Sequence, residues 1–528
     1  MKLRSVNNLG ISFERIVNQY SKNVALRFSS VNAVSYQELN MKANQFAKYL
    51  LDIGVNQTDV VCVSGNKKAS TFACMIGCLK MGAIYSMLDP ESPVERLRKI
   101  IKTCNPKVLF VEPGLGKKLH KVIEDIGCKV IENETDFLES RLKEFDQSNL
   151  IQTQDITGTN PAYIMFTSGS TGFPKGAVMT HANVLNLIAW SLETYNISAD
   201  EILTNVNPLY FDNSVFDFYS SLFSGASMVP FTKEIVTDPK KLVEMIDELK
   251  CTSWFSVPSM LIFLDTMKVF NKQNMKEIKR FIFGGEGYPK AKLKRLFDTY
   301  GDRAEIHNVY GPTECTCICS SYKICSYDLE DLKGLPPLGN MSDNFSYLIL
   351  DEKNDKVQDG EVGELCLLGP NVGKGYYNDH ERTQTSFIQN PYNDNDVEIM
   401  YKTGDMVKYN PDDDKIYIMG RRDNQIKHMG YRIELEEIET ALSSLEYVSQ
   451  AAVLHGTIRG LSQIIAVVSS NDEIHETLIR NDLKTIIPDY MIPSKVCIIY
   501  KLPRNPNNLQ GFRVPNFQSR GRGTIPKG

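Results

Sequence analysis

The stretch that decides the fold is Tyr163-Ile164-Met165-Phe166-Thr167-Ser168-Gly169-Ser170-Thr171-Gly172-Phe173-Pro174-Lys175-Gly176. Its first four residues are apolar or aromatic, which predicts a buried strand. The ten residues that follow contain three glycines, four hydroxyl side chains, one proline and one lysine. Glycines let a backbone approach a ligand closely, and successive backbone N–H groups beside a lysine form an anion site. We therefore expect a strand followed by a phosphate-binding loop; a flexible surface loop is the alternative interpretation.

Neither of the two common nucleotide-binding motifs accounts for this loop. A Walker loop requires Gly, four residues and then Gly-Lys-Ser/Thr, but counting from Gly169 places Pro174 at the second glycine. The sequence also contains no Gly-x-Gly-x-x-Gly motif for a dinucleotide. The loop must therefore be of a different kind.

Length and composition set further bounds. At 528 residues the chain is long enough for about three packed units. Its net charge of -5 argues against a basic nucleic-acid surface. The first ten residues lack the apolar core of a signal peptide, and no run of about 18 apolar residues follows. We expect a cytoplasmic protein with neither a nucleic-acid nor a membrane partner.

Strand-like and helix-like segments alternate over the first two thirds of the chain, which predicts parallel sheets with crossover helices. Helices are expected at 13–20, 36–51 and 69–81, and strands at 60–63, 108–111, 129–131, 253–257, 280–283 and 305–309. Short alternating runs at 347–350, 363–368, 406–409 and 415–419 predict antiparallel strands in a small β-barrel. The polar segment 133–155 reads as a surface connection, and 432–442 as an amphipathic helix.

These patterns predict an α/β fold in three parts. Residues 1–422 form a large N-terminal domain of parallel sheets plus the small barrel, and residues 423–504 form a small α+β domain. The polar turn from Gly420 to Gln425 is a plausible hinge. Residues 505–528 have few apolar side chains and many Gly, Pro and Arg, which is typical of a disordered tail.

Four cysteines are crowded at Cys315, Cys317, Cys319 and Cys325. Their Cys-x-Cys-x-Cys spacing differs from the paired Cys-x-x-Cys of zinc sites. Alternation with a period of two fits one face of a strand. We therefore expect buried reduced thiols rather than metal ligands.

Further motifs occur along the chain in a characteristic order. One of them, Leu79-Lys80-Met81-Gly82-Ala83, precedes the glycine loop. Those that follow the loop are Phe211-Asp212-Asn213-Ser214, Asn308-Val309-Tyr310-Gly311-Pro312-Thr313-Glu314, Gly363-Glu364-Leu365, Tyr401-Lys402-Thr403-Gly404-Asp405, the run from Gly420 to Lys427, and Tyr490-Met491-Ile492-Pro493. With these motifs the chain resembles the adenylate-forming family of acyl-CoA synthetases, luciferases and adenylation domains of non-ribosomal peptide synthetases. The resemblance implies a large ATP-binding domain followed by a mobile small one.

Several residues have a chemistry of their own that suits a nucleotide. A tyrosine ring such as Tyr310 can stack on adenine, and Glu314 is a hard oxygen ligand suited to Mg²⁺. Asp405 can accept two hydrogen bonds from a ribose diol, although an aspartate in a Thr-Gly-Asp turn can simply bond its own backbone. Likewise a lone Arg421 can be a surface ion pair, and the residues around Glu314 can be a Gly-Pro turn with a solvated carboxylate.

The resemblance carries these residues over as a site for ATP and Mg²⁺. It implies catalytic roles for Thr167, Lys175, Glu314 and Lys427, with Glu314 as the metal ligand and Asp423 as the hinge. The implied nucleotide contacts are Thr167, Ser168, Gly169, Ser170, Thr171, Gly172, Lys175, Asn308, Tyr310, Gly311, Thr313, Asp405, Tyr417 and Arg421.

Asp212 has two interpretations. It can cap the helix expected from Ser214, since Asp is a favoured N-cap residue. Relatives that activate amino acids carry Asp in this Phe-Asp position, where it faces the α-ammonium, and we favour that role. The implied substrate pocket is otherwise uncharged and mostly apolar, as for an aliphatic side chain; it comprises Asp212, Asn213, Phe216, Phe255, Ile282, Gly284, Val309, Cys317 and Ile318.

The sequence departs from the family at its end. Relatives finish with Asn-Pro-x-Gly-Lys, but Asn508 and Leu509 stand here at the Gly and Lys positions. The expected function is ATP-dependent formation of an aminoacyl-adenylate, followed by transfer to the phosphopantetheine thiol of a separate carrier protein. Two alternatives are an acyl- or aryl-CoA ligase of the same fold and a catalytically impaired nucleotide-binding homologue that lacks the lysine.

Overall fold

The computed structural model describes residues 8–499, apart from residues 134, 170–171, 459–460 and 471–473. The chain separates into two compact units. The first unit comprises Met1–Pro90, Ile100–Thr167 and Lys175–Asp423. The second comprises Glu91–Lys99, Ser168–Pro174 and Asn424–Gly528, so the glycine loop groups with the C-terminal segment. Of the predicted tail, residues 505–528 lie outside the described residues.

The largest sheet of the first unit has the strand order β14-β13-β12-β11-β9-β10-β1-β2 within the described residues. Its six central strands are parallel, and β14 and β2 run antiparallel at the two edges. This confirms the predicted parallel sheet. The bounds are β1 (Val24–Arg27), β2 (Ala33–Ser35), β9 (Ile202–Asn205), β10 (Ser227–Pro230), β11 (Ser253–Ser256), β12 (Arg280–Gly284), β13 (Glu305–Tyr310) and β14 (Ser320–Lys323).

A second parallel sheet carries the strand that opens the deciding stretch. Its order is β6-β5-β3-β4-β7-β8, and only the β7–β8 pair is antiparallel. The apolar run predicted as a strand is β7, and it is buried as expected. The bounds are β3 (Val60–Val63), β4 (Ile84–Met87), β5 (Val108–Val111), β6 (Lys129–Glu132), β7 (Pro161–Thr167) and β8 (Lys175–Thr180).

A third sheet of the first unit is antiparallel, in agreement with the texture change expected near residue 347. It has the order β15-β16-β18-β17, and β19 also pairs with β18. The bounds are β15 (Ser346–Leu350), β16 (Val362–Leu368), β17 (Phe387–Gln389), β18 (Ile399–Asn410) and β19 (Lys415–Arg421).

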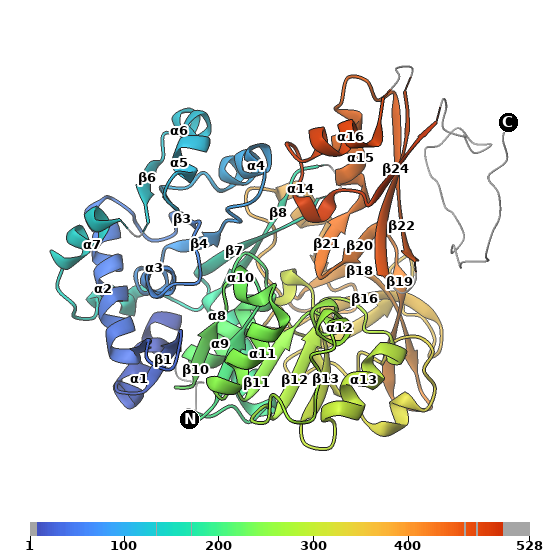
Figure 1. The fold of residues 1–528 in the computed structure, drawn as a ribbon, viewed down its shortest axis with the longest axis horizontal. Coiled ribbons are helices and arrows are strands. Elements are labelled where there is room, and N and C mark those ends of the chain that lie inside the picture. Colours follow the sequence, from blue (N-terminus) through green and yellow to red (C-terminus); the bar gives the residue numbers. More distant parts are fainter. Residues whose placement is uncertain (1–7, 134, 170–171, 459–460, 471–473, 500–528) are drawn as a thin grey trace. The chain divides into compact units, whose positions relative to one another are not determined.

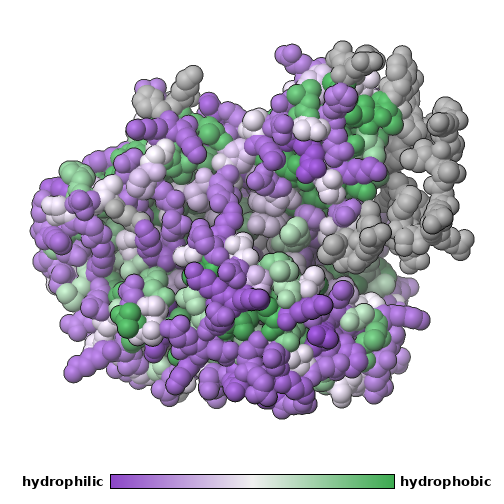
Figure 2. All heavy atoms as spheres, viewed as in Figure 1, coloured by the Kyte–Doolittle hydropathy of each residue, from purple (hydrophilic) through white to green (hydrophobic). Residues whose placement is uncertain are grey.

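Helices cover both faces of the large sheet. Figure 1 shows α11 (Pro239–Glu248), α12 (Pro258–Thr266) and α13 (Lys290–Tyr300) over the strands β11, β12 and β13, and their leucines share one core with Trp254. On the other face, α9 (Asn213–Leu222) packs against β9, β10 and β11. The outer side of α11–α13 is mostly hydrophilic, with small separate hydrophobic patches (Figure 2).

The remaining helices of the first unit begin and end at ordinary local signals. Ser35 and Glu38 form a capping box that starts α2, and Gly82, with φ of 79°, ends α3. The helices are α1 (Leu9–Tyr20), α2 (Tyr36–Asp52), α3 (Ala69–Met81), α5 (Leu115–Lys118), α6 (His120–Ile126), α7 (Asp136–Lys143), α8 (His181–Thr194), α10 (Lys233–Val236) and α14 (His380–Ser386). Helix α4 (Val94–Cys104) contributes to both units. Within the described residues, no helix is both long and apolar enough to cross a membrane.

The second unit contains a β-hairpin, a three-stranded sheet and two helices of its own. Strands β20 (Gln425–His428) and β21 (Tyr431–Glu434) form the hairpin, and the sheet has the order β22-β23-β24. Helices α15 and α16 share one core with that sheet. The bounds are α15 (Leu435–Ser443), β22 (Gln450–Ile458), β23 (Leu461–Ser469), α16 (Glu476–Leu483) and β24 (Lys495–Ile499).

Three local predictions were wrong. The helix expected at 432–442 begins at Leu435, because the preceding residues form β21 in the hairpin. The segment 133–155, which was expected to be a surface connection, contains helix α7. Its Leu138 and Leu142 are buried, but the charged residues around them obscured the helical pattern in the sequence. The alternating cysteines lie on a 3₁₀ turn and a left-handed bend rather than on a strand, and Cys325 is exposed.

Candidate active site

The β7–β8 hairpin sets two of the predicted residues opposite each other. Thr167 ends β7 and pairs in register with Lys175, the first residue of β8. Thr167 is 8% exposed, and its hydroxyl oxygen is buried with no hydrogen-bond partner. An unpaired buried hydroxyl is costly, so it is a natural place for a ligand oxygen to bind. The hairpin therefore presents a hydroxyl and a lysine at the two ends of the glycine loop.

The described part of the loop belongs to the second unit and is a tight turn. Gly172 has φ of 72°, a conformation that favours glycine, and its N–H donates to the Gly169 carbonyl at 2.9 Å. The Gly169 N–H donates to the Glu437 carboxylate at 3.3 Å. A backbone N–H of the loop thus already binds an anionic oxygen, which is the role expected of it toward a phosphate. Ser170 and Thr171 lie outside the described residues.

Glu314 lies on a short 3₁₀ turn (Thr313–Cys315) directly after β13 and is completely buried. Its carboxylate accepts a hydrogen bond from the Tyr376 hydroxyl at 2.7 Å. The Lys175 ammonium lies 6.0 Å from the centroid of the same tyrosine ring. Tyr376 thereby joins the predicted metal ligand to the predicted phosphate ligand. Sequence reasoning missed Tyr376, because a Gly-Tyr-Tyr-Asn run in a loop has no period that marks it.

The chemistry of Glu314 fits Mg²⁺. A buried carboxylate is a hard oxygen ligand, and Mg²⁺ in nucleotide sites is often held by one or two carboxylates together with substrate phosphates. Among the described residues, no three His, Cys, Asp or Glu side chains gather as a metal cluster. One carboxylate that shares Tyr376 with the lysine predicted to bind phosphate fits such a substrate-bridged ion.

Asp405 is fixed by partners on both sides. It accepts hydrogen bonds from the Tyr310 hydroxyl at 2.6 Å and from the Arg421 guanidinium at 2.9 Å. Burial, together with the neighbouring Asp405 carboxylate, holds the pKa of Tyr310 well above its usual value. The tyrosine therefore stays protonated and donates to the carboxylate. Arg421 also pairs with Asp423, the predicted hinge residue, at 2.6 Å.

Glu364 supports the turn that carries Asp405. Its carboxylate accepts from the Gly404 N–H at 2.9 Å and from the Arg422 guanidinium at 2.6 Å, while only 2% of the residue is exposed. The motif around Glu364 was identified in the sequence, but its structural role was not. These two partners lie 40 and 58 residues away in the chain, so no local pattern could reveal the role.

Two further predicted nucleotide contacts lie on β13 and directly after it. The Asn308 amide donates to the Pro337 carbonyl at 2.8 Å, which holds residues 335–338 beside this strand end. Gly311 lies so close to Cys317 that a Cβ there would be 2.2 Å from the Cys317 carbonyl oxygen. Only glycine fits this position, so the Tyr-Gly-Pro-Thr-Glu run needs its glycine for close backbone packing.

Asp212 does not act as a side-chain helix cap. It precedes α9 in a right-handed helical conformation, and its side chain makes no capping hydrogen bond. Its carboxylate accepts a hydrogen bond from the Thr313 hydroxyl at 2.6 Å instead. Thr313 directly precedes Glu314 in the chain. The predicted ammonium ligand, Asp212, is therefore hydrogen-bonded to the residue next to the predicted metal ligand, Glu314.

The predicted pocket residues lie together on the α9 face of the large sheet. Phe255 of β11 is in register with Ile282 of β12, and Gly284 of β12 is in register with Val309 of β13. The ring of Phe216 from α9 packs on Phe255 with centroids 5.0 Å apart. Ile318 is buried in the same core. This wall is apolar and carries no charge.

Two members of the pocket set add polarity. The Asn213 side-chain nitrogen is buried with no hydrogen-bond partner, and it lies 3.5 Å from the position that a Cβ on Gly285 would take. The Cys317 thiol is buried; burial, followed by the charge of Asp212, raises its pKa well above the usual value. Cys317 therefore stays a neutral thiol next to the carboxylate, and Asn213 offers an N–H donor.

The other predicted residues are described by their own elements. Tyr417 of β19 donates its hydroxyl to Asp413 at 2.5 Å. Lys427 lies on β20 in the second unit. Asn508 and Leu509 lie outside the described residues, so their predicted consequence is a matter for experiment.

Comparison with known proteins places the chain in a family. Residues 13–377 match the family described as AMP-binding enzyme, and the chain belongs to this family. Its relatives include a dimodular nonribosomal peptide synthase of Bacillus subtilis (strain 168), 30% identical over 96% of this chain and 21% of that protein. A D-alanine--D-alanyl carrier protein ligase of Listeria monocytogenes is 32% identical over 88% of this chain and 89% of that protein. The chain thus spans about a fifth or less of the first synthetases it matches, but most of the ligase.

Solved structures share the fold. An artificially fused adenylation–carrier di-domain from Klebsiella oxytoca superposes with a TM-score of 0.79 at 20% identity, covering 93% of each chain. A Vibrio cholerae adenylation domain in complex with glycyl-adenosine-5′-phosphate has a TM-score of 0.78 at 21% identity, covering 95% of each chain. The α/β fold with parallel and antiparallel sheets is that of the adenylate-forming superfamily.

Proposed function

We propose that this protein activates an amino acid with ATP, forming an aminoacyl-adenylate and pyrophosphate, and then transfers the aminoacyl group to a carrier-protein thiol. The observation that carries the proposal is the hydrogen bond from Thr313 to Asp212, 2.6 Å long, one residue from buried Glu314. It sets a carboxylate suited to an ammonium group beside the residues suited to phosphate and metal. One relative, matched over 89% of its length, is a ligase whose name specifies an amino acid and a carrier protein.

In the first half-reaction, a carboxylate oxygen of the amino acid forms a bond to the α-phosphorus of ATP, and the bond from that phosphorus to the bridging oxygen breaks. Pyrophosphate leaves with the electron pair. This chemistry depends mainly on positioning and charge neutralisation. Lys175, the Thr167 hydroxyl and the loop N–H groups would bind phosphate oxygens, and Asp212 would hold the ammonium. Mg²⁺ on Glu314 would supply further positive charge to the phosphates.

In the second half-reaction, the sulfur of a phosphopantetheine arm forms a thioester with the aminoacyl carbon, and AMP leaves. We assign Lys427 to this step from the family resemblance. A carrier protein is the proposed acceptor, because a relative matched over 89% of its length is named as a carrier-protein ligase.

The substrate side chain is proposed to be uncharged and aliphatic. Phe216, Phe255, Ile282 and Val309 offer only apolar surface, and a charged side chain there would be buried without a partner. Asn213 adds one N–H donor, which also suits a small polar group on the substrate.

The experiment is ATP–pyrophosphate exchange with a panel of amino acids and simple carboxylic acids. We expect exchange with uncharged aliphatic amino acids and none with aspartate or lysine. Exchange with acids that lack the amine, at rates equal to those of the amino acids, would instead identify an acyl- or aryl-CoA ligase.

The tail provides a second test. Because Asn508 and Leu509 replace Gly and Lys, we expect slow adenylation by the chain as it stands. A lysine at the reacting centre offers charge-assisted hydrogen bonds of about 1.5–3 kcal/mol each. Replacing the sequence after Asn507 with Gly-Lys should therefore raise the exchange rate by roughly two to four powers of ten. An unchanged rate would mean that another cation, such as Lys501 or Arg504, already supplies this charge.

A further inference from the structure

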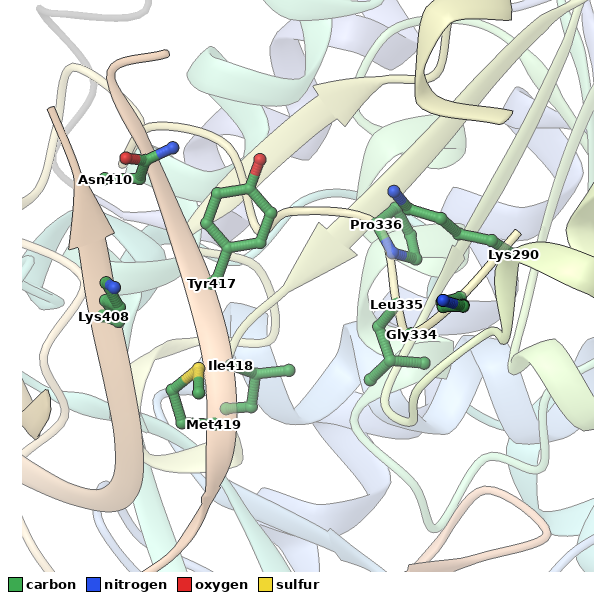
Figure 3. Close-up of a pocket in the computed structure, with 10 residues that line it drawn as sticks. Lys290, Gly334, Leu335, Pro336, Lys408, Asn410, Tyr417, Ile418 and Met419 are labelled. Atoms are coloured by element: carbon green, nitrogen blue, oxygen red, sulfur yellow. The ribbon is translucent and has the colours of Figure 1, made fainter. Parts of the chain in front are cut away.

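A pocket of about 520 Å³ lies in the first unit. Figure 3 shows it between strand β19 on one side and residues 334–336 on the other. Lys408 and Asn410 come from β18, and Lys290 is the first residue of α13. Apart from Tyr417, none of its lining residues is among the predicted ATP or substrate contacts.

The pocket is rich in positive charge that has no counter-ion. Lys290, Lys333 and Lys408 all line it. Within the described part of the chain, none of these three ammonium groups forms an ion pair. Lys290 extends across the pocket toward Tyr417 (Figure 3). Three ammonium groups around one cavity repel one another, and an anion bound among them would remove that repulsion.

Two carboxylates in the turn before β19 are hydrogen-bonded to tyrosines. Asp413 accepts the Tyr417 hydroxyl at 2.5 Å, and Asp414 accepts the Tyr409 hydroxyl at 2.9 Å. Since the Tyr417 hydroxyl is occupied, this residue offers its ring rather than its oxygen to the pocket. The turn that holds these aspartates therefore shapes the cavity without neutralising its lysines.

The rest of the lining is apolar. Leu335, Pro336, Ile418 and Met419 face the cavity together with the Tyr417 ring. Cavities of a few hundred Å³ that combine an apolar wall with a few charged groups are typical of small-molecule sites. Lysine is a common ligand of phosphate because its ammonium acts as a compact point charge.

We infer that this pocket is a second anion site, which binds a ligand with two or three linked phosphates whose body contacts the Tyr417 and Leu335 wall. Three ammonium groups match the charge of a di- or triphosphate better than that of a single carboxylate. The inference does not depend on the proposed adenylation reaction.

The test is isothermal titration of the full chain with two probes, inorganic tripolyphosphate and ATP. The starting protein carries Lys175→Ala, which weakens phosphate binding at the glycine loop. The pocket variant adds Lys290→Gln, Lys333→Gln and Lys408→Gln. The matched control adds Lys240→Gln, Lys268→Gln and Lys353→Gln, three exposed lysines elsewhere in the same unit. Both variants lose the same net charge.

We expect the pocket variant to weaken tripolyphosphate binding at least tenfold and the control to change it less than twofold. Binding should also weaken as salt is raised, because exposed charges are screened. ATP binding that is tighter than tripolyphosphate binding in the starting protein, and that weakens in the pocket variant but not in the control, would show that the apolar wall takes part and that the ligand is a nucleotide; equal affinities would identify a polyphosphate. Equal affinities of the pocket and control variants for both probes would overturn the inference, as would the absence of binding that depends on the pocket lysines.

Circular dichroism and the melting temperature establish that each variant is folded. Exchange activity, measured without Lys175→Ala, separates this inference from the proposed function. Loss of pocket binding with exchange intact leaves the adenylation proposal standing. Loss of exchange in the Asp212→Ala protein does not affect the inference about the pocket, because Asp212 does not line it.

Discussion

The two faces of strands β11, β12 and β13 differ in a way that separates folding from function. On the α11–α13 face, Trp254, Phe281 and Phe283 form a closed apolar core, and the Trp254 N–H donates to Ser256 at 2.8 Å. On the α9 face, alternate residues of the same strands line the candidate pocket, and buried polar atoms without partners gather there. These atoms include Asn213 Nδ2, Asp217 Oδ1 and Asn205 Oδ1; on the helix-packed face, Tyr288 Oη and Thr204 Oγ1 also lack a partner.

Unpaired buried polar atoms are expensive, so their concentration on one face indicates a role other than stability. Asp217 illustrates this. It accepts hydrogen bonds from Asn205 and Asn207 and lies beside pocket residue Phe216, and burial raises its pKa. We propose that the helix-packed face mainly stabilises the fold, whereas the α9 face binds the substrate.

The largest expected effects come from two substitutions, one on each face: one lowers activity and the other lowers stability. Asp212→Ala should lower kcat/KM for an amino acid by about 150- to 4,000-fold, because a substrate ammonium left without its carboxylate costs ~3–5 kcal/mol. Its melting temperature should change little, since Asp212 makes no capping bond. Leu293→Ala on the other face should instead lower the free energy of unfolding by about 2–5 kcal/mol. Exchange kinetics and thermal melts of both variants check this, and a reversal of the two effects would contradict the division.

Lys175→Ala should give the next effect. Removing the cation opposite Thr167 eliminates charge-assisted hydrogen bonds worth ~1.5–3 kcal/mol, so exchange should fall by about 10- to 150-fold. Lys353→Ala, an exposed lysine of the same unit, serves as the control. Unchanged exchange kinetics in Lys175→Ala would remove the hairpin from the site.

His181 allows a test of a buried group that serves the fold alone. Its Nδ1 accepts from the Leu9 N–H at 3.0 Å, and burial lowers its pKa to about 3. In the unfolded chain this histidine binds a proton with a pKa near 6.5. The stability that comes from keeping His181 neutral in the fold is therefore fully present above pH 6.5 and is lost as the pH falls toward 3. Between pH 7.5 and 5.5, His181 should account for about 1.4 kcal/mol of lost stability. Denaturant unfolding of wild type and His181→Asn at both pH values measures it; an equal pH dependence in the two proteins would exclude the assignment.

The smallest effect is expected at Glu364, which acts through Asp405. Glu364→Gln keeps the shape but removes the charge that pairs with Arg422, so the turn that presents Asp405 should loosen. We expect KM for ATP to rise about five- to tenfold with kcat nearly unchanged, equivalent to roughly 1–1.4 kcal/mol. A fall in kcat without a change in KM would argue against a role in presenting Asp405.

The sequence predicted the class of fold because that information is local. The apolar strands, the glycine loop and the change to antiparallel texture near residue 347 all have short periods or short motifs. The sequence analysis did not predict the pairing of Asp212 with Thr313 or of Tyr310 with Asp405, because these partners lie 101 and 95 positions apart. Tyr376 was missed because its contact with Glu314 joins residues 62 positions apart.

Other errors came from patterns that fit more than one structure. The alternating cysteines suggested a strand, but Thr316 and Cys317 both adopt positive φ because the chain must bend close to Gly311. The predicted helix at 432–442 began too early in the chain. The pattern of residues 432–434 suits a hairpin strand as well as a helix turn, and these residues belong to β21. Tertiary pairing decided both cases.

The central claim is that Asp212 recognises an amino group, and one measurement tests it most directly. Wild-type ATP–pyrophosphate exchange should be compared for alanine against propionic acid and for valine against 3-methylbutanoic acid, pairs that differ only in the amine. The account predicts that each amino acid is at least about 100-fold better in kcat/KM, since the ammonium contributes ~3–5 kcal/mol through its carboxylate. Equal kcat/KM values within each pair would contradict it.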